Sequence, residues 1–200
     1  MAALSRSPAP KPLLAASSAT GLAGFAVAIT LAALSIAVNA WSQESLEIAV
    51  KAAYLYKFAP FITWRANSLT PSDPFTICIV GSDPFGSVLD RAAANQRVDG
   101  RLILVLRMVK ADRKSPCQIM YIGGSPARVR ETLQAVSGAP ILTVTDSPTA
   151  PGVVDFVIDQ GRVRFRLDDE AAADDGLTIS SKLLSLAVSV KPRKSVGGAR

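Results

Sequence analysis

The stretch that decides the fold is Phe75–Gly86, which reads FTICIVGSDPFG. Its first half is a short apolar run, rich in β-branched residues, that stops at Gly81, and such a run is typical of a buried strand. Gly81-Ser82-Asp83 then predicts a turn. Asp83 and Pro84 predict the start of a helix, because Asp is favoured at the N-cap position and Pro at the first helical position.

The same order of strand, turn and helix returns further along the chain. The later strands are expected at Leu102–Val109, Cys117–Ile122 and Pro140–Thr145. Short helices are expected over about Gly86–Ala94 and from Pro126 to about Val136, and Ser125 is suited to cap the second. Strands that alternate with helices indicate a layered α/β domain, with a mostly parallel sheet flanked by helices.

A C-terminal β-hairpin gives the clearest local signal. Val153–Asp159 and Arg162–Leu167 flank the dipeptide Gln160-Gly161, which is suited to a two-residue hairpin turn. The register that this turn imposes places Asp155 opposite Arg166. Because this face of the hairpin carries paired charges, we expect it to be solvated.

Three further segments carry weaker signals. Lys110–Pro116 is short for a parallel crossover, so either it forms a tight helical turn or one neighbouring strand runs antiparallel. The strand Leu102–Val109 is apolar on both faces in its first half, which predicts an internal position in the sheet. A last helix is expected over about Ser181–Val190, with Ser180 as its cap.

A helix rich in aromatic residues is expected before the first strand. The apolar residues that recur on one of its faces are Leu46, Val50, Tyr54, Phe58 and Phe61. Pro60 has no N–H to donate, so the helix should end or kink near Ala59. The aromatic residues fit either a core helix or a binding site. We expect Tyr56 and Trp64 to be the exposed members, which makes them candidates for partner contact.

The charges lie unevenly along the 200 residues. The chain has 22 Lys and Arg, 16 Asp and Glu and no His, which gives a net charge of +6. Six of the basic residues lie in the first 40 or the last ten positions, which leaves 16 basic against 16 acidic residues in the body. A body that is neutral by count argues against a nucleic-acid partner. We expect one domain over residues 41–190 and a disordered basic tail over residues 191–200.

The first 40 residues have the layout of a secretory signal peptide. Their only charges are the basic residues Arg6 and Lys11. Leu22–Val38 is densely apolar, and the small residues that follow permit cleavage before Trp41. The alternative is an uncleaved membrane anchor, because the apolar run is close to the ~20 residues that span a bilayer. In both cases the body enters an oxidising compartment.

Cys78 and Cys117 are the two cysteines of the chain. In an oxidising compartment, a count of two suggests a disulfide. The alternative is a pair of buried thiols, since free Cys is among the most buried residue types.

Two glycine turns are candidates for a small-ligand site, because ligands in such sheets bind beyond the carboxyl ends of the strands. Gly81-Ser82-Asp83 and Gly123-Gly124-Ser125 each precede a helix N-terminus, which favours anions. The candidate ligand-binding residues are Ser82, Asp83, Gly124 and Ser125. Ordinary turns are the alternative, because neither turn matches a phosphate-binding motif.

Catalysis has less support. The absence of His removes the commonest general base and most catalytic zinc sites. Because no nucleophile–base pair can be named, we expect no enzyme activity, no bound metal and no cofactor.

Three stretches resemble the YfiR-like periplasmic family (the DUF4154 group). They are Val50–Trp64, VKAAYLYKFAPFITW; Phe75–Leu89, FTICIVGSDPFGSVL; and Gly152–Ala187, which ends in GLTISSKLLSLA. Together with the strand that begins at Cys117, they cover about residues 47–188. The chain departs from the family at Asp155, where Asn is usual.

The resemblance implies an α/β fold and a function. The family's best-described member is a soluble periplasmic repressor that binds the periplasmic domain of a membrane diguanylate cyclase, lowers cyclic-di-GMP and tends to dimerise. The resemblance therefore implies a non-catalytic, homodimeric periplasmic regulator that represses the sensor domain of an inner-membrane signalling protein. It also matches Cys78 and Cys117 to one disulfide pair of that member. The alternative function is a periplasmic small-ligand-binding module that uses the two glycine turns.

Overall fold

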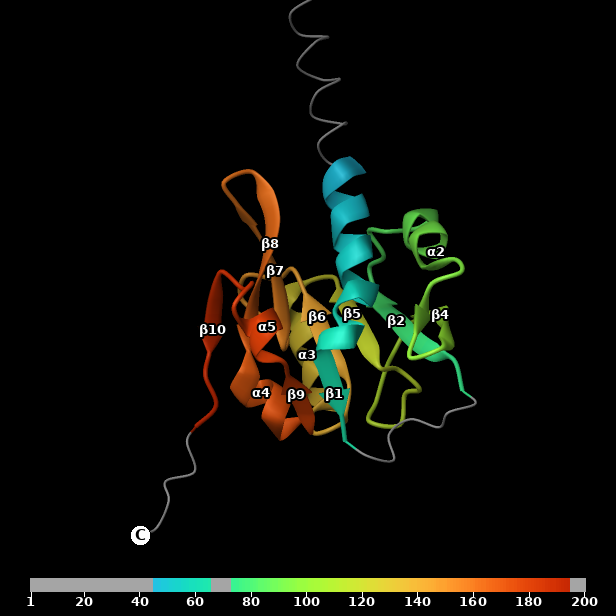
Figure 1. Ribbon diagram of the computed structural model, residues 1–200. Helices are drawn as coiled ribbons and strands as arrows, with labels where there is room; N and C mark the ends of the chain where they lie inside the picture. The colour runs from blue at the N-terminus through green and yellow to red at the C-terminus, as the bar shows by residue number, and fades with distance from the viewer. Residues whose placement is uncertain (1–44, 66–72, 195–200) are drawn as a thin grey trace, which may run out of the picture. The chain divides into compact units, whose positions relative to one another are not determined.

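The strand predicted at Phe75 lies inside an eight-stranded sheet (Figure 1). The structure is a computed structural model that describes residues 45–65 and 73–194, all within the compact unit of residues 43–200. In spatial order the strands are β10 (Ser189–Lys191), β8 (Arg162–Asp168), β7 (Val154–Asp159), β6 (Leu142–Thr145), β5 (Ile119–Gly123), β2 (Phe75–Gly81), β4 (Arg101–Met108) and β3 (Arg97–Val98). Pairing is parallel throughout, except between β7 and β8 and between β3 and β4. The predicted α/β fold with a mostly parallel sheet is confirmed.

Both faces of β2 are buried, because successive side chains of a strand point to opposite faces. Ile77 and Ile79 belong to one hydrophobic cluster, and Cys78 and Val80 belong to the other. The first cluster packs under a helix of residues 45–57 (the first helix), α2 (Ser87–Ala93), α4 (Asp169–Asp174) and α5 (Ser181–Leu184). The second cluster packs under α3 (Pro126–Val136). Helices therefore cover both faces of the sheet.

The first helix ends where Pro60 predicts, in the 3₁₀ turn η1 (Ala59–Phe61). Its buried side chains include Ala52 and Leu55, and Phe58, which follows its last residue, is buried too. The predicted apolar face is wrong at Leu46, whose exposed fraction is 64%. The helix face that meets the sheet is rotated by about one residue position from the predicted apolar face. The small side chain of Ala52 lets the helix approach the sheet closely.

Two local predictions near the helices differ in outcome. α3 begins at Pro126 with Ser125 as its cap, as predicted. α2 (Ser87–Ala93) confirms the helix predicted over about Gly86–Ala94, but Asp83 and Pro84 do not start it. Asp83 Oδ1 instead accepts hydrogen bonds from the N–H groups of Phe85 (2.7 Å) and Gly86 (3.1 Å). These bonds close a turn ahead of the helix.

The hairpin of β7 and β8 has the predicted register, with Asp155 opposite Arg166. The prediction of an internal β4 is wrong for most of its length. β3 pairs only with Arg101 and Leu102, so among the described residues β2 is the one strand neighbour of the rest of β4. Leu102 and Leu104 accordingly have exposed fractions of 50% and 47%.

The connection from β4 to β5 is a parallel crossover without a helix. Both strands pair parallel with β2, one on each side of it. The crossover contains a tight turn in which Ser115 N–H donates to the Asp112 carbonyl at 3.1 Å. Cys117, at the end of the crossover, is bonded to Cys78 in β2, with Cα atoms 5.8 Å apart. The chain therefore contains the disulfide, and the alternative of two thiols is wrong.

The structure contains short strands that the sequence did not indicate, one before β2 and two near the C-terminus. β1 (Ile62–Trp64) and β9 (Leu177–Ile179) form a separate antiparallel pair. The predicted last helix is wrong beyond Leu184, because the chain leaves α5 to form β10, which pairs with β8.

The predicted disordered tail is wrong at its start, since Lys191 ends β10 and pairs with Asp168 (3.0 Å) and Glu170 (2.9 Å). The predicted signal peptide and residues 195–200 of the tail lie outside the described residues. Within residues 45–65 and 73–194, no helix combines the length and the apolar character that a membrane crossing requires.

Candidate functional site

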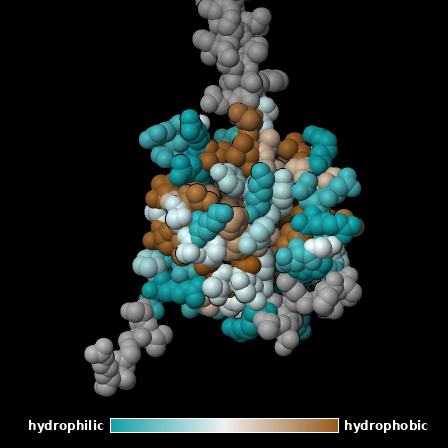
Figure 2. All heavy atoms as spheres, in the orientation of Figure 1, coloured by the Kyte–Doolittle hydropathy of each residue, from teal (hydrophilic) through white to brown (hydrophobic). Residues whose placement is uncertain are grey.

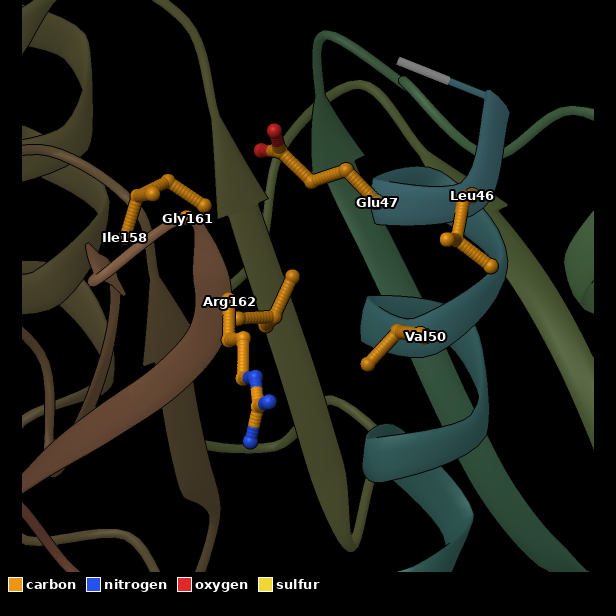
Figure 3. Close-up of a pocket in the computed structure, with 7 residues that line it drawn as sticks. Leu46, Glu47, Val50, Ile158, Gly161 and Arg162 are labelled. Carbon is orange, nitrogen blue, oxygen red and sulfur yellow. The ribbon is translucent and has the colours of Figure 1, made fainter. Parts of the chain in front are cut away.

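A groove runs between the first helix and the hairpin of β7 and β8. Hydrophobic side chains gather beside this helix on the face shown in Figure 2. The first part of the groove is a hollow of about 390 Å³. Figure 3 shows Glu47 and Val50 of the helix on one side of it, and Ile158 and Arg162 of the hairpin on the other. Its lining residues are Leu46, Glu47, Val50, Ile158, Gly161, Arg162 and Val163.

The groove continues toward α5 as a second hollow of about 500 Å³. This hollow is lined by Tyr54, Lys57, Phe58, Phe61, Arg162, Val163, Arg164, Phe165, Leu183 and Leu186. Arg162 and Val163 line both hollows, so the two hollows form one continuous surface. We call this surface the helix–hairpin groove.

The hairpin forms one wall of the groove because it extends beyond its neighbour in the sheet (Figure 1). β6 pairs with β7 only at Val154 and Asp155. Further along, β8 is the one strand partner of β7 among the described residues. A two-stranded ribbon twists more strongly than a wide sheet, and this arm leaves Ile158 with an exposed fraction of 55%.

Aromatic side chains hold the C-terminal half of the first helix against the hairpin. The rings of Phe58 and Phe165 meet edge to face with centroids 5.2 Å apart, and Tyr54 stacks on Phe58 at 5.6 Å. Leu46 lies more than two turns before Phe58 and is largely exposed. The groove therefore has an aromatic floor at one end and an aliphatic rim at the other.

The charges on the groove are mostly positive. Lys57, Arg162 and Arg164 line it, and Lys182 Nζ lies 5.8 Å from the centroid of the Phe61 ring. None of these four cations forms an ion pair with a carboxylate of the described residues. The acidic residue of the lining, Glu47, is paired with Lys51 at 2.7 Å. The groove thus joins apolar surface with unpaired positive charge.

The two glycine turns predicted as a ligand site do meet. Gly81 and Gly123 are register partners in β2 and β5, and Ser82 N–H donates to the Gly123 carbonyl at 3.1 Å. Ser125 Oγ accepts from Arg128 N–H at 3.5 Å, which caps α3. The polar groups that we assigned to a ligand are therefore partly used within the fold. The assignment of Ser82, Asp83, Gly124 and Ser125 to a ligand remains a prediction.

Asp83 has its own partners in this region. Arg107 Nε donates to its Oδ2 at 2.7 Å. Burial alone would raise the pKa of Asp83, but the hydrogen bonds from Arg107 and from the N–H groups of Phe85 and Gly86 hold the pKa below its ordinary value. Asp83 is therefore a charged group that joins β4 to the turn after β2.

Tyr56 and Trp64 are half-buried, so the expectation that they are exposed is wrong. The ring of Trp64 packs edge-on against Phe75, with centroids 5.4 Å apart, and this contact covers it. Neither residue lines the two hollows of the helix–hairpin groove. Their role in partner contact remains a prediction.

Asp155 is buried, so the expectation of a solvated face is wrong here. Its exposed fraction is 4%, and Thr145 Oγ1 donates to its carboxylate at 3.3 Å. Burial raises the pKa of Asp155, while the hydrogen bond from Thr145 and the charge of Arg166 act in the opposite direction. Asp155 lies beside Thr145, its register partner in β6, and the hairpin register alone does not reveal this neighbour.

The groove was not predicted from the sequence, because its apolar residues lie at positions whose pattern predicts burial in the core. Leu46 belongs to the apolar helix face that the sequence predicts, and Ile158 pairs with the apolar Val163 in the hairpin. The sequence offers no signal for the groove, because the strand predicted at Pro140–Thr145 is as long as β7, and the difference in length appears only in the structure. Leu142–Thr145 is only four residues long, whereas Val154–Asp159 has six.

Comparison with known proteins gives one match and one negative result. A family model described as YfiR/HmsC-like matches residues 48–188. The search of curated proteins finds no match to the chain.

Proposed function

Because the chain belongs to the YfiR/HmsC-like family, we propose that it is a periplasmic regulator that binds and represses the periplasmic sensor domain of an inner-membrane diguanylate cyclase. The observation that carries the proposal is the extent of the match. Residues 48–188 run from the first helix to the residue before β10, which is almost the whole described fold. The family's best-described member acts as such a repressor.

Two features of the molecule support this proposal. The disulfide of Cys78 and Cys117 fits an oxidising compartment such as the periplasm. The helix–hairpin groove offers apolar, aromatic and arginine side chains together, and residues of these kinds are enriched at protein–protein interfaces.

Capture from membranes tests the proposal. The oxidised protein, immobilised on beads, is expected to retain a diguanylate cyclase from detergent-solubilised inner membranes. The periplasmic domain of that cyclase should then bind the purified protein in calorimetry, and deletion of the regulator should raise cellular cyclic-di-GMP. Unchanged cyclic-di-GMP together with capture of no sensor protein would contradict the proposal.

The alternative, a small-ligand-binding module, has one observation in its favour. The turns at Ser82 and Gly123 meet at the carboxyl ends of β2 and β5, which is where ligands bind in parallel sheets. Thermal unfolding with inorganic phosphate, nucleotides and amino acids tests this alternative. A raised melting temperature that Ser82→Ala abolishes would favour it over the regulator.

A further inference from the structure

We propose that the helix–hairpin groove binds an acidic segment of a partner protein that carries large apolar side chains. This inference rests on the proposed function, because it names the surface and the partner chemistry of the same regulator.

The apolar side chains of the groove are the first reason. Leu46, Ile158 and Leu186 have exposed fractions of 64%, 55% and 51%, and all three line the groove. Single exposed hydrophobic residues are ordinary, but three along one groove with an aromatic floor mark an interaction surface. Large apolar side chains of a partner would remove this surface from water.

The unpaired cations are the second reason. Lys57 and Arg162 are exposed, line the groove and have no carboxylate partner among the described residues. By contrast, Lys191 and Arg193 on the other side of β8 are paired with carboxylates at the start of α4. An acidic segment would complement the charge of the groove, and complementary charge both steers association and selects the partner.

Charge also argues against two other occupants. A second copy bound through the same groove would bring cations to face cations, because a two-fold interface presents the same surface twice. Among the chain's own segments outside the described residues, 66–72 and 195–200 contain no Asp or Glu, and residues 1–44 contain only Glu44. The acidic segment therefore belongs to another protein.

Charge reversal in the groove tests the inference. The probe is a synthetic 16-residue peptide of Glu, Leu and Phe, titrated against the oxidised full chain by fluorescence anisotropy. Lys57→Glu/Arg162→Glu should weaken its binding at least about tenfold, and added salt should weaken binding to the unmodified chain. The matched control is Arg113→Glu/Lys114→Glu, which makes the same charge change at exposed residues of the β4–β5 crossover and should leave affinity within about twofold.

The apolar component has its own matched pair. Leu46→Ser/Ile158→Ser should weaken binding of the peptide, whereas Leu102→Ser/Leu104→Ser, at two leucines of β4 with exposed fractions of 50% and 47%, should not. A peptide with Ser in place of Leu and Phe should bind more weakly than the original to the unmodified chain. Equal loss of affinity in the groove variants and in their controls would overturn the inference, because net charge or general stickiness would then explain the binding.

The sensor domain separates failure of the inference from failure of the proposed function. If the domain binds and the groove variants bind it as well as the unmodified chain does, the inference is wrong and the function stands. If the peptide behaves as expected but no sensor domain binds, the groove chemistry is supported and the proposed function is wrong. If sedimentation shows a dimer that Lys57→Glu/Arg162→Glu dissociates, the occupant is a second copy and the inference is wrong.

Discussion

At the scale of the residue, two carboxyl groups have opposite relations to their surroundings. Asp83 is hydrogen-bonded to Arg107 and to two backbone N–H groups, and its pKa is lowered. Asp155 is buried beside the last residue of β6, Thr145, which is its hydrogen-bond donor, and its pKa is raised. The charged form of Asp83 therefore stabilises the fold, whereas the charged form of Asp155 costs free energy.

Asp155→Asn is expected to raise the free energy of unfolding at pH 7 by about 1 kcal/mol. Asn can still accept the hydrogen bond from Thr145, but it carries no charge to desolvate. The folded-state pKa of Asp155 lies above its ordinary value of 3.8. The free-energy cost of burying its charge is therefore fully present above the folded-state pKa, where the carboxylate is ionised, and absent below 3.8, where the carboxyl group is protonated in both states. The stability advantage of Asp155→Asn should therefore disappear near pH 3.5, as measured by urea unfolding.

The control for this substitution is Asp159→Asn, at the other end of the same strand, which should change stability by less than about 0.5 kcal/mol. If Asp155→Asn lowers stability at pH 7, the ion pair with Arg166 at 3.8 Å outweighs the cost of burial.

Asp83→Asn is expected to lower stability at pH 7 by about 0.5–1 kcal/mol, since it removes the charge that Arg107 faces in a partly solvated pair. The folded-state pKa of Asp83 lies below 3.8, so this stabilisation is present above 3.8 and is lost as the pH falls through the folded pKa. Asp83→Ala should cost about 1 kcal/mol more, because it also removes the acceptor for two N–H groups. If the two substitutions lower the melting temperature equally, the hydrogen bonds from the two N–H groups to Asp83 contribute nothing to stability.

At the scale of the element, turns and helix caps could be predicted from neighbouring residues, whereas the pairing of strands distant in sequence could not. The Gln160-Gly161 turn fixed the hairpin register, and Ser125 with Pro126 fixed the start of α3, because each signal acts within a few residues. β1 pairs Ile62 with Ile179, and strands of three residues have no periodicity from which to read such a distant partner. The groove could not be predicted for the same reason, since it depends on where the first helix and the hairpin separate.

A disulfide joins the end of the β4–β5 crossover to β2. Because the bond closes a loop between residues 39 positions apart, reduction is expected to lower the free energy of unfolding by about 4 kcal/mol. Urea unfolding with and without a phosphine reductant measures this difference. Cys78→Ala/Cys117→Ala is the control, because the reductant should not affect its stability. Two reactive thiols in the native, unreduced protein would contradict the structure.

At the scale of the whole molecule, the charges balance overall but are unevenly distributed over the surface. The body is neutral by count, but Lys57, Arg162, Arg164 and Lys182 are concentrated around one groove. A neutral body with a local basic groove favours recognition of one acidic surface over general adsorption to nucleic acid. This distribution fits the proposed regulator, which would bind one partner at a membrane.

The predicted signal peptide gives a further prediction, which concerns the N-terminus of the exported protein. Residues 1–40 lie outside the described residues, and their composition predicts cleavage before Trp41. N-terminal sequencing of the periplasmic protein should therefore begin at Trp41. Ala40→Glu should block processing, whereas Asn39→Glu, at the position that the cleavage signal leaves free, should not. A periplasmic protein that begins at Met1 would show an uncleaved anchor.

The contact between Gly81 and Gly123 has a consequence for evolution. A side chain on Gly81 would strike the carbonyl of Gly123, and one on Gly123 would strike the carbonyl of Ser82. Both obstacles are backbone atoms, so no compensating change at a neighbouring side chain can relieve them. In any descendant that keeps these two strands side by side, we expect both glycines to be retained, even where the groove has diverged toward another partner. The pair would therefore trace common ancestry, whereas the groove would trace the choice of partner.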